Sequence, residues 1–62
     1  MLIGSAFIWV LLVRDHGVDI LNERIASGGQ QACINRAEAF MADYKNSNPS
    51  ARLQYLCQMV KQ

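Results

Sequence analysis

An unbroken row of seven apolar residues stands near the start of the chain: Phe7-Ile8-Trp9-Val10-Leu11-Leu12-Val13. The row belongs to a longer segment, Met1 to Val13, that contains no charged side chain, whereas all six basic and five acidic residues lie between Arg14 and Lys61. A helix without a polar side is typical of a segment that is buried all round. A protein of 62 residues has too little mass to surround such a helix. The row therefore favours burial in something other than the chain's own core.

A membrane is the first such environment. As a helix, residues 1–13 would cover about 20 Å, against roughly 30 Å for the hydrocarbon core of a bilayer. Extension past Arg14, whose long side chain can reach the interface, would reduce the deficit. We interpret residues 1–17 as an apolar N-terminal helix and candidate membrane anchor. Its lipid-facing residues are Leu2, Ile3, Phe7, Ile8, Trp9, Val10, Leu11, Leu12 and Val13. The alternative is the core helix of a soluble bundle, which the shortness of the run favours.

The remainder, residues 18–62, shows helical spacing of apolar residues in three segments. Val18, Leu21 and Ile25 predict a helix over about 18–27. A glycine pair then interrupts the pattern. The next stripe predicts a helix over 30–45; its members are Cys33, Ala37, Phe40, Met41 and Tyr44.

Residues 46–50 have the composition of a turn, with Pro49 suited to the first position of a following helix. A last apolar stripe predicts a helix over 49–61; its members are Leu53, Leu56, Cys57 and Val60. The predicted fold class is all-α: an N-terminal apolar helix followed by a small helical hairpin.

The two cysteines fall on the apolar stripes of the last two segments. Cys33 and Cys57 should therefore face the seam between two antiparallel helices, with an axial offset of about 6 Å that a crossing angle would close. A bridge would close a loop of about 25 residues and stabilise the fold by roughly 3 kcal/mol. We predict that this disulfide staples the hairpin. The alternative is two reduced, buried thiols that act as small hydrophobic groups.

A disulfide indicates an oxidising compartment. Together with the anchor, it predicts a membrane-anchored protein whose helical body lies in the periplasm or another extracytoplasmic space. Arg14 and Arg24, just beyond the apolar segment, point the other way, since positive charges tend to stay on the cytoplasmic side. The orientation in the membrane stays open.

Residues that carry catalysis or bind metals do not occur in a suitable pattern. His16 is the only histidine, and the chain has no Cys-x-x-Cys pair. A dyad of His16 with Cys33 or Cys57 would lack an orienting partner and a pocket. We expect no catalytic residue, no metal site, no cofactor and no enzymatic activity. A net charge of +1 with interleaved signs also argues against nucleic acid as a partner.

Met41 and Tyr55 lie off the tightest apolar stripes, which makes them candidates for a surface that faces a partner. The alternative is ordinary packing on the helix at 18–27. The expected partner is a protein of unknown identity; a membrane is a second candidate, and self-association into a homo-oligomer is left open.

The plan of anchor and stapled hairpin resembles short cell-envelope proteins of bacteria and phages, among them lysis regulators, exclusion factors and lysozyme inhibitors, although no residue motif identifies a family. The resemblance implies a small non-catalytic, membrane-anchored protein that binds and modulates a protein partner. The alternative is a soluble minor structural subunit of a larger assembly, with the apolar N-terminus buried against its neighbours.

Overall fold

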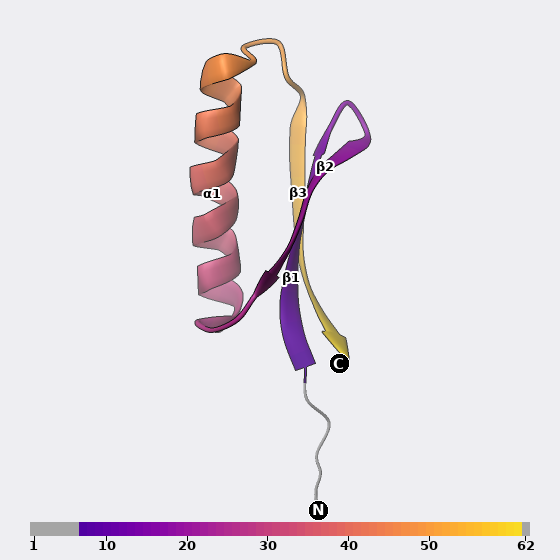
Figure 1. The fold of residues 1–62 in the computed structure, drawn as a ribbon, viewed down its shortest axis with the longest axis vertical. Helices are drawn as coiled ribbons and strands as arrows, with labels where there is room; N and C mark the ends of the chain where they lie inside the picture. The colour runs from indigo at the N-terminus through magenta and orange to yellow at the C-terminus, as the bar shows by residue number, and fades with distance from the viewer. Residues whose placement is uncertain (1–6, 62) are drawn as a thin grey trace, which may run out of the picture.

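The computed structural model describes residues 7–61, which form a three-stranded antiparallel sheet and one helix. The elements follow in the order β1 (Phe7–Asp15), β2 (Val18–Ile25), α1 (Gly29–Ser47) and β3 (Leu53–Lys61). The strand order is β2-β1-β3, so the first strand is the central one. Helix α1 lies along one side of the sheet (Figure 1). The predicted all-α fold is therefore wrong.

The apolar row at residues 7–13 forms most of the central strand, not an N-terminal helix. A strand with apolar side chains on both of its faces reads as a continuous apolar run. Such a run cannot be told from a buried helix by periodicity, because neither pattern has a polar side. Aromatic and β-branched residues such as Trp9, Val10 and Val13 favour the strand.

The structure also overturns the membrane anchor. Among residues 7–61, no helix is long and apolar enough to cross a membrane. The residues from Phe7 to Val13 that were predicted to face lipid are sheet residues. Leu2 and Ile3, the other two predicted anchor residues, lie outside the described part of the chain. The prediction of a single-pass, membrane-anchored protein is withdrawn.

Strands β1 and β2 form a hairpin in place of the predicted helix over 18–27. The connection is His16-Gly17, and both residues have positive φ angles, 52° and 81°. Two successive positive φ angles define the turn that best matches the twist of a two-residue hairpin. The ladder between the strands shifts register between Val13 and Arg14. This irregularity obscures the alternation of side chains along β2.

Helix α1 confirms the predicted helix at 30–45 and extends it slightly at both ends. It starts after Gly28, whose φ of 93° lies in the left-handed region. A Cβ atom at this position would lie 2.5 Å from the Cβ atom of Ala32, so the entry into the helix requires glycine.

Strand β3 replaces the predicted helix over 49–61, and the helical hairpin is therefore absent. It pairs with β1 along its whole length, from Phe7 opposite Lys61 to Asp15 opposite Leu53. The apolar residues of this segment fit two periods equally well. Leu53, Leu56 and Val60 suit a helix, but the alternating set suits a strand; it consists of Leu53, Tyr55, Cys57 and Met59.

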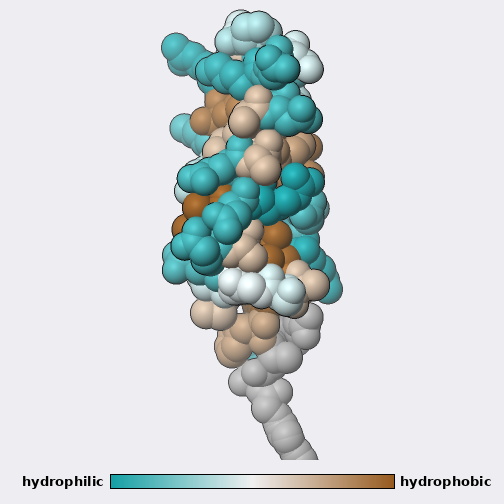
Figure 2. Space-filling view, turned by 90° about the vertical axis from the view of Figure 1, so that its left-hand side faces the viewer, coloured by the Kyte–Doolittle hydropathy of each residue, from teal (hydrophilic) through white to brown (hydrophobic). Residues whose placement is uncertain are grey.

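The core lies between the sheet and α1 and is small. Four fully buried residues form it: Leu11, Val13, Cys33 and Ala37. Eight partly buried side chains surround them, drawn from all four elements. The outer surface of the molecule on the side where α1 lies is largely hydrophilic, with apolar patches between the polar side chains (Figure 2).

Candidate interaction surface

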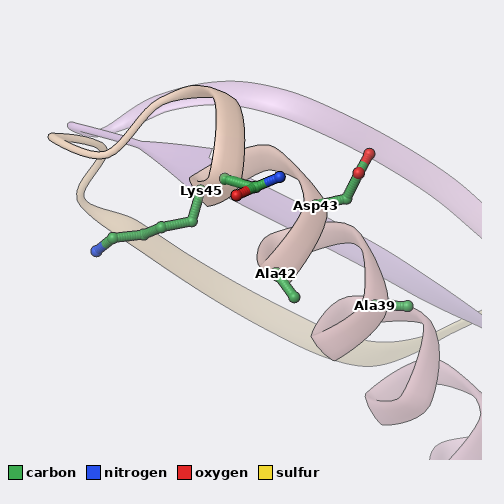
Figure 3. Close-up of a pocket in the computed structure, with 5 residues that line it drawn as sticks. Ala39, Ala42, Asp43 and Lys45 are labelled. Atoms are coloured by element: carbon green, nitrogen blue, oxygen red, sulfur yellow. The ribbon is translucent and has the colours of Figure 1, made fainter.

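The outer surface of α1 carries a shallow hollow near the end of the helix, which offers no chemical site. Its lining residues all come from α1, and the two that carry charge are Asp43 and Lys45. Their side chains point in different directions, and the other labelled residues, Ala39 and Ala42, are small (Figure 3). Polar groups must converge on one point to bind a small molecule or a reacting atom. This surface therefore remains an ordinary solvated face of a helix.

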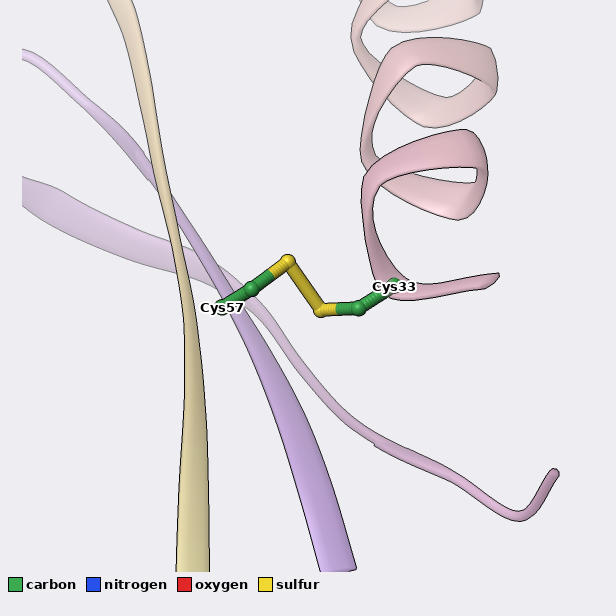
Figure 4. The surroundings of a disulfide bond; sticks show 2 residues. All are labelled: Cys33 and Cys57. Carbon is green, nitrogen blue, oxygen red and sulfur yellow. A yellow bond between two sulfur atoms is a disulfide. The ribbon is translucent and has the colours of Figure 1, made fainter. Parts of the chain in front are cut away.

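The predicted disulfide between Cys33 and Cys57 is present, and the structure confirms it. The bond joins the N-terminal part of α1 to β3, with the two Cα atoms 6.1 Å apart (Figure 4). This separation is within the usual range for disulfides. The bridge therefore holds the helix on the sheet and does not staple two helices. In residues 7–61 neither thiol is free.

A second link joins three elements at the hairpin end of the molecule. The Asp15 carboxylate accepts hydrogen bonds from the backbone N–H of Arg52 at 3.0 Å and from the Tyr44 hydroxyl at 3.1 Å. Its Oδ1 also lies 2.6 Å from His16 Nδ1. The bond from Arg52 is the main cause that lowers the pKa of Asp15. The bond to Asp15 raises the pKa of Tyr44.

Asp15 and His16 belong to the segment 1–17 that was predicted to be a helix, and here Asp15 ends β1 and His16 begins the turn to β2. The cluster tethers the end of α1 and the start of β3 to that turn. His16 is exposed. The arrangement is therefore a structural latch.

A third link ties β2 to α1. Arg36 donates two hydrogen bonds to Glu23, from Nε to Oε2 at 2.8 Å and from Nη2 to Oε1 at 3.0 Å. The hydrogen bond from Arg36 lowers the pKa of Glu23 and raises that of Arg36 in turn. The guanidinium also lies 5.7 Å from the centre of the Phe40 ring. All three links act on the side of the sheet that α1 covers.

The opposite side of the sheet has no element of residues 7–61 over it (Figure 1). Successive side chains of a strand point to opposite faces. Because Leu11, Val13 and Cys57 face α1, their neighbours in β1 and β3 face away from it. We call this surface the open face. Its apolar residues are Ile8, Val10, Leu12, Leu56 and Val60.

Polar side chains border the apolar stripe of the open face. The ladder places Arg24 opposite Val10 on one side and Gln58 opposite Val10 on the other. Arg14 closes the stripe at the hairpin end, where it donates to Asp19 at 2.7 Å. The face is not sealed: Leu56 is 50% exposed. Leu56 also lines a shallow hollow of about 130 Å³ with Leu12, Arg14, Gln54 and Tyr55.

The two predicted partner-facing residues lie on different elements. Met41, on α1, is half-buried and packs against the core, whereas Tyr55, on β3, is 41% exposed. Their role in binding stays a prediction. Helical periodicity gave no indication of the open face, because it assigned Leu12 to an anchor and Leu56 to a helix seam. The signal that would have found the face is given by every second residue of this segment, where Gln alternates with an apolar side chain: Gln54, Leu56, Gln58 and Val60.

No family model, curated protein or solved structure matches this chain in the comparisons with known proteins. Within the described part of the chain, no three His, Cys, Asp or Glu side chains are grouped so that they would hold a metal ion. Function must therefore be argued from the surface itself.

Proposed function

We propose that this protein is a small non-catalytic binding module that attaches to a protein partner through the open face and modulates that partner. The observation that carries the proposal is the uncovered apolar stripe on β1 and β3. Antiparallel sheets commonly keep one face in the core and one face polar and solvated. Here the second face is also apolar along its centre, from Val10 through Leu12 to Leu56.

The composition of the open face fits a protein partner. Specific interfaces have an apolar centre and a polar rim, with arginine enriched among the contacting residues. The rim here contains Arg14 and Arg24, and among residues 7–61 no carboxylate lies within ion-pair distance of Arg24. A complementary partner surface would be apolar at its centre and acidic at one border. The hollow beside Leu56, of about 130 Å³, is smaller than the roughly 300 to 1,000 Å³ of small-molecule pockets, so the face suits another protein better than a small molecule.

The rest of the molecule provides a rigid support for this face. The disulfide, the Asp15 latch and the Glu23–Arg36 pair hold α1 against the other side of the sheet. A preorganised surface loses less entropy on binding than a flexible one. The disulfide is compatible with an extracytoplasmic space. An inhibitor-type role needs no membrane anchor, so it survives the loss of the anchor helix.

Site-specific photo-crosslinking tests the proposal. A photoreactive phenylalanine analogue replaces Val10 on the open face, and a matched variant carries it at Glu38, an exposed position on α1. Exposure of cells that express each variant to light should give a discrete adduct with another protein from position 10 and none from position 38. The yield of the same adduct should fall when the Arg24→Glu substitution is combined with the analogue at position 10. Adduct formation at position 38 alone, or at neither position, would contradict the proposal.

The modulating effect needs a second measurement. Once the adduct has been identified by mass spectrometry, the purified partner is titrated with the wild-type protein and with the Arg24→Glu variant. The wild type should change the partner's activity at a lower concentration than the variant does. Equal potency of the two proteins would remove the open face from the proposal.

A further inference from the structure

The two edges of the sheet differ in how they are protected against pairing. Strand β2 carries Asp19, Glu23 and Arg24, and its ladder with β1 is irregular. Strand β3 has no charged residue and no proline from Leu53 to Val60, and its ladder with β1 is regular. Charges, prolines and bulges are the usual devices that stop an edge strand from pairing with another chain. Only β2 has them.

The outer edge of β3 has no strand beside it among residues 7–61. Side chains on β3 are also unusually exposed for their chemistry: Tyr55 is 41% exposed, Leu56 50% and Met59 55%. Of the five large apolar side chains that are exposed in the described residues, these three lie on this one strand. An unpaired hydrogen-bonding edge and a concentration of exposed apolar side chains therefore coincide.

We propose that two copies of this chain pair through β3, antiparallel and related by a two-fold axis at Leu56, to form a continuous six-stranded sheet. The proposal goes beyond the binding of a partner by the open face, because it uses the edge of the sheet and requires no other protein. In a two-fold dimer, a residue of the first copy that contacts a given position of the second copy is matched by the same contact with the two copies exchanged. A strand that pairs with itself must therefore be chemically compatible with its own reverse.

The sequence of β3 meets this condition when Leu56 lies on the axis. Leu56 is then opposite itself, and Gln54 is opposite Gln58, so that apolar and amide side chains meet their own kind on the open face. On the helix side, Leu53 is opposite Met59. Directly opposed side chains are the pairs that stabilise a sheet. Val60 and Lys61 lie beyond the matched stretch, opposite Arg52 and Ala51, which precede β3.

The neighbouring registers are poorer. With the axis at Cys57, Gln54 is opposite Val60 and Leu53 is opposite Lys61. Each of these pairs sets an apolar side chain against a polar or charged one. A register that differs from this one by an odd number of residues is excluded, because it would place the helices of the two copies on opposite faces of the six-stranded sheet. The two-fold at Leu56 is therefore the register that the side chains favour.

A second copy also suits the size of the protein. The core has only four fully buried residues in its central cluster, and small domains commonly gain stability by oligomerising. A single pair of edge strands buries less than the roughly 800 Å² per partner of a standard interface. The dimer should therefore be weak, with a Kd on the order of 10 to 100 μM.

Sedimentation equilibrium of the intact protein tests the assembly. The wild type should change from its monomer mass of 7.0 kDa to twice that mass as its concentration rises through the Kd. Leu56→Lys sets two like charges opposite each other on the axis and should shift dissociation at least tenfold toward the monomer. Val18→Lys is the matched control, since Val18 is 64% exposed on the other edge strand and should leave the dimer unchanged. A wild type that stays monomeric at about 1 mM would overturn the proposal.

A crosslink tests the register without relying on a destabilising variant. Leu56→Cys places two thiols opposite each other, and mild oxidation should give a covalent dimer while the Cys33–Cys57 bond remains intact by peptide mapping. Gln58→Cys places the thiols about 13 Å apart along the strands and should give none. A dimer from Gln58→Cys and not from Leu56→Cys would overturn the axis at Leu56. A monomeric protein that still forms the adduct from position 10 would remove the dimer and leave the partner-binding proposal standing.

Discussion

Leu11 and Leu12 are neighbours in the same strand and have the same side chain, but they lie on opposite faces of the sheet. Leu11 faces α1 and is fully buried, whereas Leu12 faces away from the helix and is only half-buried. The comparison extends to the whole of each face. The covered face holds the disulfide and both polar links, and the open face holds an apolar stripe with no element of residues 7–61 over it. Under the proposed function, an apolar residue in β1 therefore contributes to folding or to binding according to its face.

The largest expected difference between the faces comes from the two leucines themselves. Leu11→Ala removes a side chain from the closed core and should lower the free energy of unfolding by about 2 to 5 kcal/mol. Leu12→Ala leaves no closed cavity and should lower it by less than about 1 kcal/mol. Urea denaturation followed by circular dichroism measures both. Equal losses for the two variants would mean that the open face is covered in solution, as a second sheet packed on it would do.

The disulfide should have the next largest effect, because it alone joins α1 to β3 covalently. The double variant Cys33→Ala/Cys57→Ala should lose roughly 3 kcal/mol of stability, since the bridge closes a loop of about 25 residues in the unfolded chain. Thermal denaturation with and without a reductant gives the same comparison in the wild type. A reductant should leave the melting temperature of the double variant unchanged, and any shift there would show that the loss has another cause.

Helical spacing predicted α1 correctly. The stripe from Cys33 to Tyr44 has a polar opposite side, and α1 has one covered and one solvated side, so pattern and structure agree. The pairing of Cys33 with Cys57 was predicted correctly although β3 was taken for a helix. Both readings of β3 place Cys57 on the side that faces α1, and the prediction needed no more than that.

The strands were missed for three different physical reasons. In β1, both faces carry apolar side chains, so no alternation was visible. In β2, the irregularity between Val13 and Arg14 interrupts the alternation, and the spacing of Val18, Leu21 and Ile25 imitates a helix. In β3, helical and alternating spacings were both present, and only pairing with β1 decides between them. Sheet contacts between distant segments are not encoded in any local window.

The Asp15 latch makes the covered face sensitive to pH at both ends of the scale. The folded state lowers the pKa of Asp15, so its contribution is complete above the unfolded pKa of about 4 and is lost as the pH falls below that value. The folded state raises the pKa of Tyr44, so its contribution is complete below about pH 10 and is lost at higher pH. Melting temperatures from pH 2 to 11 measure both the acidic and the alkaline limb of this pH profile of stability.

Matched variants assign these limbs to the latch. Asp15→Asn should flatten the acidic limb and Tyr44→Phe the alkaline limb, while Asp43→Asn, an exposed acid on α1, should leave the profile as it is. An acidic limb that is unchanged in Asp15→Asn would assign the pH dependence to another carboxylate, with Glu23 the first candidate because its pKa is also lowered.

The smallest expected effect belongs to the pair of Glu23 and Arg36. Both groups are in contact with solvent, where an ion pair gains little because water screens the charges and two long side chains lose freedom. The bidentate geometry still favours the pair over a single contact. Glu23→Gln should therefore lower the melting temperature slightly in low salt, and the difference from wild type should disappear at about 1 M salt, where screening reaches 3 Å. Arg24→Gln, one residue away on the open face, should show neither effect. A loss in Glu23→Gln that persists in high salt would mean that the pair is packed and dry, and that the covered face extends to the edge of the sheet.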